Sequence, residues 1–291
     1  MQPRGHPGHG KRPGPPPWAA GALAALAAFL AAAAGCSRVD VLKSRLDAIE
    51  DDAARRIVRD AVWAHGSIYR WADCRALRAD VVRTEHRPGG DTDARETWVA
   101  DPCAGTFRIE SPARREVVTF DGLALRVFCD GRETADLEAR GRAAGDARLV
   151  RELLAMPVSL AAPGCEVSYV GPRTGPGDAR TWHRLLVGYG PQTGHSPDDR
   201  AVVEIRKGTD RVEAVLVRWS EWPFFGRRMR VEMDDWRPAD GPAADGPVVS
   251  RRWRFIPIDE SGEPTGPARY TVRLERVETM AAVGPGTFSR P

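Results

Sequence analysis

From Cys74 onward, apolar and polar residues alternate with a period of two, and this pattern constrains the fold more than any other feature. Met229, Val231 and Met233, for example, are separated by Arg230 and Glu232. Successive side chains of a strand point to opposite faces, so such a strand has one apolar and one solvated face. The alternation is typical of an antiparallel sheet with one wet side.

Short segments rich in Gly, Pro and Asp separate the alternating stretches, and the strongest turn signal is Asp121-Gly122. Such short connections favour antiparallel hairpins. The expected strands are 77–86, 95–110, 115–121, 123–130, 166–171, 181–189, 201–207, 212–219, 227–235, 249–257 and 268–277. We therefore expect one curved antiparallel sheet of about eleven strands.

Two segments have the helical period instead and are expected to cover the apolar face of the sheet. Segment 51–67 has an apolar stripe that includes Ile57 and Val58, with Asp51 as a suitable cap. In the long interruption 134–163, Asp146 is the expected cap of a second helix that Pro157 ends. The apolar face of that helix is expected to consist of Leu149, Val150, Leu153, Leu154 and Met156. The fold class is thus α+β, with a single domain over 51–291.

The N-terminus has the three zones of an export signal, residues 1–35. Three bases without an acid precede an apolar, Ala-rich run over 18–34, which is too short and too weakly apolar for a permanent span. The sequence Ala33-Ala34-Gly35-Cys36 resembles the lipobox of bacterial lipoproteins, although that family usually has Leu where Ala33 stands. The alternative is an ordinary signal with a cysteine near its cleavage site.

The lipobox resemblance implies that Cys36 is the mature N-terminus and carries acyl chains such as palmitate, which anchor the chain because each buried methylene contributes about 0.8 kcal/mol. Ser37 after the cysteine implies, by the same resemblance, the periplasmic face of the outer membrane. Residues 36–50 are charged and are expected to form a tether or a first helical turn next to the membrane.

The net charge of +3 belongs to the expected signal. The chain has 43 Lys and Arg against 40 Asp and Glu, and three of the bases precede Cys36, which leaves 40 against 40 in the mature part. An even balance of interspersed charges gives no electrostatic reason to expect nucleic acid or an anionic membrane surface as a partner.

Four cysteines remain after Cys36, an even number for an oxidising compartment. Three pairings are open. We favour Cys74 with Cys103, because Cys74 lies just before the expected strand 77–86 and Cys103 lies in the neighbouring expected strand 95–110, which leaves Cys129 with Cys165. The spacing lacks the patterns of zinc sites, so no metal or other cofactor is expected.

Several phrases resemble the LolA/LolB superfamily of outer-membrane lipoprotein-sorting proteins: FRIESPARREVVTFDG over 107–122, VEMDDWRPADG over 231–241 and GTFSRP at the end. The resemblance implies an unclosed half-barrel of about eleven strands covered by helices, with acyl chains bound in an apolar cavity between sheet and helices. A lipid anchor is closer to the LolB arrangement than to soluble LolA.

Two candidate binding features follow. The first is the cavity lining, for which we expect Phe107, Ile109, Leu125, Val127, Val231, Met233 and Trp253; the alternative is a packed core without space. The second is the segment WSEWPFFG, whose Trp222, Phe224 and Phe225 are expected at a hairpin tip that contacts a membrane or a client's acyl chain. Folding of that tip over the sheet edge is the alternative.

The sequence lacks the motifs of hydrolases, metalloproteases, nucleotide- and dinucleotide-binding enzymes, and its histidines are scattered singly. We therefore expect no enzyme and no catalytic residue. The expected function is a carrier or receptor for lipid or lipoprotein acyl chains. The alternative is an envelope interaction or stress-sensing protein that uses the same fold without a transported ligand.

Overall fold

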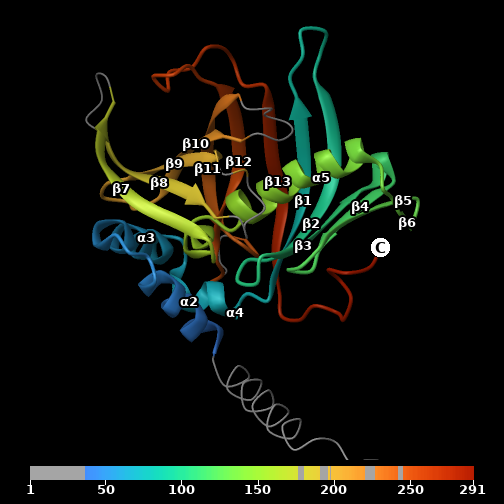
Figure 1. Cartoon of the computed structure of the whole chain (residues 1–291), viewed down its shortest axis with the longest axis horizontal. Coiled ribbons are helices and arrows are strands. Elements are labelled where there is room, and N and C mark those ends of the chain that lie inside the picture. The colour runs from blue at the N-terminus through green and yellow to red at the C-terminus, as the bar shows by residue number, and fades with distance from the viewer. Residues whose placement is uncertain (1–36, 176–179, 191–195, 197, 220–226, 242–244) are drawn as a thin grey trace, which may run out of the picture.

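The computed structural model describes residues 37–175, 180–190, 196, 198–219, 227–241 and 245–291. Within these residues, thirteen strands form one antiparallel sheet in the order β6-β5-β4-β3-β2-β1-β13-β12-β11-β10-β9-β8-β7. The sheet curves strongly, and helices lie across its inner face and at one end (Figure 1). The end strands β6 and β7 pair with one neighbour each in the described chain, so the barrel is open. This confirms the expected α+β half-barrel.

The strands are β1 (Ala76–Glu85), β2 (Thr92–Asp101), β3 (Thr106–Ser111), β4 (Glu116–Phe120), β5 (Leu125–Cys129), β6 (Arg132–Glu133), β7 (Cys165–Thr174), β8 (Thr181–Tyr189), β9 (Arg200–Arg206), β10 (Val212–Arg218), β11 (Arg228–Pro238), β12 (Val248–Pro257) and β13 (Tyr270–Met280). The helices are α2 (Arg38–Asp47), α3 (Asp52–Ala64), α4 (Ser67–Asp73) and α5 (Leu137–Arg148), with the short helices η1 (Pro112–Arg114), η2 (Leu149–Leu154) and η3 (Val158–Ala161).

The strand count exceeds eleven for two reasons. The stretch 95–110, expected as one strand, is divided between β2 and β3 by a tight turn in which the Asp101 carboxylate accepts hydrogen bonds from the amides of Cys103 and Ala104 at 2.9 and 3.0 Å. Gly105 completes the turn with φ +70°, a conformation that favours glycine. The other addition is β6, whose two residues are too few for an alternation to be visible in the sequence.

The first expected helix is confirmed as α3, and its cap Asp51 has two roles. One carboxylate oxygen accepts hydrogen bonds from the amides of Ala53 and Ala54, at 2.9 and 3.0 Å, which satisfies N–H groups that the helix cannot pair itself. The other oxygen accepts from the amide of Tyr169 on the edge strand β7 at 2.9 Å. Asp51 therefore joins the start of α3 to the edge of the sheet.

Residues 38–47, expected as tether or first turn, form the helix α2, whose Leu42 and Leu46 are buried in the core. Ser37 caps it by accepting a hydrogen bond from the amide of Asp40. Helices α2, α3 and α4 gather at the end of the molecule where the described chain begins (Figure 1).

Asp146 does not cap the second helix, which corrects the sequence-based expectation. The helix α5 begins after Asp136, whose carboxylate accepts from the amides of Glu138 and Ala139 at 2.7 and 3.0 Å. Asp146 lies in the last turn of α5, where its carboxylate pairs with arginines. After α5 the chain continues as one π-helical segment, η2, and then as η3. We call residues 137–161, which comprise α5, η2, η3 and the residues that join η2 to η3, the cover.

Some expected features lie outside the described residues: the signal 1–35, the lipidation site Cys36, and the loop residues Trp222, Phe224 and Phe225. Every helix in the described ranges is too short or too polar to cross a bilayer.

Candidate functional site

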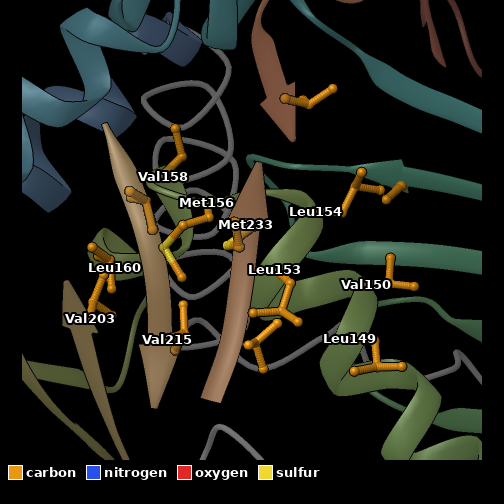
Figure 2. Close-up of a cluster of buried hydrophobic side chains, with 14 of the residues drawn as sticks. Leu149, Val150, Leu153, Leu154, Met156, Val158, Leu160, Val203, Val215 and Met233 are labelled. Carbon is orange, nitrogen blue, oxygen red and sulfur yellow. The ribbon is translucent and has the colours of Figure 1, made fainter. Parts of the chain in front are cut away.

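An apolar layer lies between the cover and the inner face of the sheet (Figure 2). The cover contributes Leu149, Val150, Leu153, Leu154, Met156, Val158 and Leu160, and the facing strands contribute Val203, Val215 and Met233. All ten side chains are at most 4% exposed. The side chains from the cover come from two successive short helices and from the residues between them, so a short stretch of chain supplies this side of the layer.

The seven expected lining residues lie in or against this apolar core. Six of them, all except Leu125, are at most 3% exposed. Leu125 is partly buried and packs against the same cluster. They are distributed over β3 (Phe107, Ile109), β5 (Leu125, Val127), β11 (Val231, Met233) and β12 (Trp253). The Trp253 ring also packs against Trp98, with 5.8 Å between ring centroids.

Side chains fill the space beside the cover. The cavity that Arg83, Leu149 and Phe255 line measures about 20 Å³. A volume of this size accommodates roughly one water molecule, so an acyl chain does not fit there. The layer between cover and sheet is closed at this position.

A buried ionic cluster holds the end of α5 against the sheet. Arg83 of β1 pairs with Asp146 of α5, and its guanidinium lies 3.7 Å from the Glu96 carboxylate of β2. Arg114, which follows β3, lies 3.2 Å from Glu96 and 3.4 Å from Asp146. At the other side, Glu116 of β4 is 3.2 Å from Arg114 and 3.4 Å from an arginine of α5. The three carboxylate side chains are at most 2% exposed.

Hydrogen bonds complete the cluster. Glu96 accepts from the Trp98 indole at 2.8 Å and from the Ser111 hydroxyl at 3.2 Å. Burial alone would lower the pKa of Arg83, but the carboxylates of Asp146 and Glu96 reverse this and hold that pKa above its ordinary value. Burial raises the pKa of Asp146, and the positive charges of Arg83 and Arg114 oppose this rise. Acidic and basic side chains of the cluster thus lie next to one another inside the protein.

A second buried ion pair ties the same end of α5 to another part of the sheet. Arg148 and Asp199 approach to 2.6 Å, with side chains 6% and 3% exposed. Asp199 precedes β9 and also accepts a hydrogen bond from the amide of Ser196 at 3.1 Å. The cover is thus tied to both halves of the sheet by charges, while its apolar side chains face the core.

The four cysteines after Cys36 are free thiols in the structure, so both expected disulfides stay predictions. Cys74 and Cys103 are neighbours beside Arg38, which donates to the Cys74 carbonyl at 3.1 Å. Burial raises the pKa of Cys74, and the nearby Cys103 raises it further. Cys129 ends β5 and Cys165 begins β7, at opposite ends of the strand order. The sheet therefore gives no support for the second pairing.

No group of three or more His, Cys, Asp or Glu side chains in the described ranges is placed to hold a metal ion. The ionic cluster was missed by sequence reasoning. Its one visible signal is Glu96, an acid two residues before the buried Trp98, at a position of β2 where the alternation predicts a buried apolar residue. Arg83, Arg114 and Asp146 carry no such mark, because arginines and acids occur throughout the solvated faces of the sheet.

An open antiparallel sheet with helices across its inner face defines the LolA/LolB-like fold, and this chain has that fold. It is similar to the crystal structure of a LolA superfamily protein from Nitrosomonas europaea, with a TM-score of 0.53 at 9% identity, covering 81% of this chain and 97% of the other. A DUF1329 family protein from Desulfovibrio piger gives a TM-score of 0.52 at 12% identity, covering 82% and 98%. In sequence, neither a family model nor a curated protein matches the chain.

Proposed function

We propose that this protein is a lipid-anchored envelope protein that binds acyl chains of a lipid or lipoprotein between the sheet and the cover, as a carrier or receptor. The observation that carries the proposal is the apolar layer: two short helices and the residues that join them present seven buried apolar side chains to the sheet in a LolA/LolB-like fold. Burial of apolar surface is non-directional and contributes about 25 cal/mol per Å², so such a site needs no polar signature.

Binding requires the cover to move, because the cavity at its edge measures about 20 Å³. Leu149, Leu153 and Met156 then contact the entering acyl chain in place of the strands, so one set of apolar contacts replaces another. Opening the cover also costs free energy, because it separates Asp146 from Arg83 and Asp199 from Arg148. The ion pairs therefore keep the empty layer closed, and the ligand must compensate for their loss.

The same proposal includes the lipid anchor, the cellular location and the aromatic loop. Cys36 carries the acyl chains, residues 1–35 are removed as the signal, and the protein resides at the periplasmic face of the outer membrane. Trp222, Phe224 and Phe225 contact the membrane or the client. Labelling cells with an alkyne-bearing fatty acid tests the anchor: the label is expected on the wild type and absent from Cys36→Ala.

The closed packing of the layer favours a second candidate, an interaction or stress-sensing protein that uses the fold without a transported ligand. Mass spectrometry of lipid extracted with solvent from the purified protein separates the two. Copurified lipid beyond the covalent anchor supports the carrier. Its absence, together with failure to bind a pyrene-labelled fatty acid, leaves the second candidate.

Matched variants localise the binding. Leu153→Glu places a charge in the apolar layer, where the side chain is 1% exposed, and is expected to reduce pyrene-fatty-acid binding at least about tenfold, since a buried unpaired charge is strongly unfavourable. Leu137→Glu, at the start of α5 and 85% exposed, is the control and should bind as the wild type does. Equal binding by both variants would place the ligand elsewhere.

A further inference from the structure

Two large aromatic side chains of the N-terminal helices face solvent. Trp63 in the last turn of α3 is 54% exposed, and Tyr69 of α4 is 49% exposed. Their rings meet edge to face with centroids 6.1 Å apart, and the Lys43 ammonium of α2 lies 5.6 Å from the Tyr69 ring centroid. We call these three residues the aromatic patch. It combines side chains of three separate helices at one place on the surface.

Packing of the helices does not account for the patch. The buried residues of α3 and α4 lie on other faces: Val62 next to Trp63 is 2% exposed, and Ile68 next to Tyr69 is 5% exposed. A tryptophan or tyrosine can bury 150–250 Å² of surface, roughly half of which remains in water here. The two rings are therefore available to a partner.

The position of the patch indicates that partner. The helix α2 begins at Arg38, and Ser37 is its cap, so a single residue separates it from the proposed lipidated Cys36. One residue spans at most about 3.6 Å, which holds α2 at the bilayer surface whenever Cys36 is acylated. Asp47 at the end of α2 pairs with Arg59 of α3 at 2.7 Å, so α3 stays beside it. All three helices lie where the described chain begins (Figure 1).

The residue types match a bilayer interface. Tryptophan and tyrosine concentrate at the level of the lipid headgroups, where their apolar bodies are buried and their polar groups stay wet. A lysine beside them lays its methylenes along apolar surface and keeps its ammonium in water. Charges elsewhere on these helices are of both signs, so the attraction is interfacial rather than electrostatic.

We propose that the aromatic patch rests in the interfacial region of the membrane that holds the Cys36 anchor and thereby fixes the orientation of the half-barrel on that membrane. The anchor alone leaves the domain free to rotate about one residue, whereas the anchor and the patch together make two contacts. This proposal requires acylation of Cys36 but no ligand in the apolar layer, so it stands or falls separately from acyl-chain binding.

The test uses the full acylated protein, extracted from membranes and reconstituted into vesicles of phosphatidylethanolamine and phosphatidylglycerol. Half of the preparations contain brominated acyl chains, which quench tryptophan at short range. Tryptophan emission of the wild type is expected to fall in the brominated vesicles, and Trp63→Phe is expected to remove most of that loss. Mass spectrometry confirms acylation of each variant, and equal melting temperatures confirm folding.

Trp222→Phe is the matched comparison, because Trp222 belongs to the other candidate membrane contact. Bromine-dependent quenching that survives Trp63→Phe and disappears in Trp222→Phe would overturn the proposal, as would an acylated wild type that is not quenched. A patch that instead holds a second copy of the chain would give a dimer in detergent that Trp63→Phe dissociates, with no quenching, and would equally overturn it.

Discussion

Arg83 on β1 and Asp146 on α5, 63 residues apart in the sequence, form an ion pair across the boundary between sheet and cover. The pair is nearly inaccessible, with side chains 14% and 1% exposed. The ion pair joins α5 to β1. Hydrogen bonds hold the strands of the sheet together, whereas apolar contacts hold much of the cover to the sheet. In the proposed binding function the cover is the part that moves, and this ion pair resists its movement.

Arg83→Met is expected to lower the free energy of unfolding by about 3–5 kcal/mol, because it leaves the carboxylates of Asp146 and Glu96 buried with one arginine fewer. Urea titration followed by circular dichroism measures it. Arg78→Met on the same strand is the control: Arg78 is 42% exposed, its ion pairs are 3.6 and 3.8 Å long, and its loss should change stability by less than about 1 kcal/mol. Similar losses for both variants would contradict the role of the cluster.

Asp146→Asn is expected to speed the uptake of a pyrene-labelled fatty acid, since it removes the charge that holds α5 to Arg83 while nearly preserving side-chain volume. Stopped-flow fluorescence measures the rate, and an increase of severalfold is expected. Glu138→Gln is a suitable comparison because Glu138 is exposed on the same helix and pairs only with Arg142 among the described ion pairs. An unchanged rate in Asp146→Asn would show that the cover does not limit entry.

His65 gives the protein a pH dependence of known sign. Its ring is fully buried, Nδ1 donates to the Ala61 carbonyl at 2.7 Å, and burial lowers the pKa of His65 to about 4. A depressed folded pKa means that its contribution to stability is fully present above the unfolded value of about 6.5 and is lost as the pH falls toward about 4. The loss is on the order of 3 kcal/mol.

His65→Asn tests this dependence, because asparagine keeps a donor near the Nδ1 position but does not titrate in this range. The difference in unfolding free energy between wild type and variant, measured at a series of pH values, is expected to shrink from pH 7 to pH 4. A constant difference would assign the acid sensitivity to other groups.

The thiols provide a prediction about oxidation. In protein purified under non-reducing conditions from its proposed periplasmic location, we expect a Cys74–Cys103 disulfide, since these two are neighbours beside Arg38, and reduced Cys129 and Cys165. Burial raises the pKa of Cys74 to about 12, so any reduced fraction should resist alkylation until the protein unfolds. Peptide mapping decides the pairing, and a peptide linking Cys129 to Cys165 would contradict the strand order.

Gly66 is a position where any side chain should destabilise the fold. It joins α3 to α4 with φ +106°, and a Cβ there would lie 3.0 Å from the Gly246 carbonyl oxygen. Gly66→Ala is expected to lower the melting temperature, by strain on the order of 1–3 kcal/mol. Gly89→Ala, with nothing within 4 Å of the added methyl, is the control and should melt within a few degrees of the wild type.

Most of the fold was predictable because local patterns determine it. Alternation located the strands, and Asp51 located the start of α3, since the cap acts on amides two and three residues away. The second cap was assigned wrongly because Asp136 and Asp146 both precede apolar residues on a helical stretch, and the choice between them depends on Arg83, which lies far away in the sequence.

The candidate site was predictable only in part. The alternation of apolar and polar residues correctly assigned Phe107, Val231 and Trp253 to the inner face, because side chains of a strand point to the same face every two residues. Whether those side chains line a cavity or fill a core depends on the volume that the cover occupies, which no local pattern encodes. The ionic cluster forms only where five separate elements, β1, β2, η1, β4 and α5, meet, and its arginines look like any others in the sequence.

The second carboxylate oxygen of Asp51 accepts a hydrogen bond from the Tyr169 amide, and this bond helps to keep the edge of the open sheet from pairing with another molecule. An unpaired edge strand presents free amides and carbonyls to which a strand of another molecule can add. Here one edge, β6, is only two charged residues long. The other, β7, has a register shift between Tyr169 and Gly171, contains Pro172, and gives an amide to the side chain of a helix cap. A half-barrel can therefore stay open at both sides without adding strands from neighbouring copies of the chain.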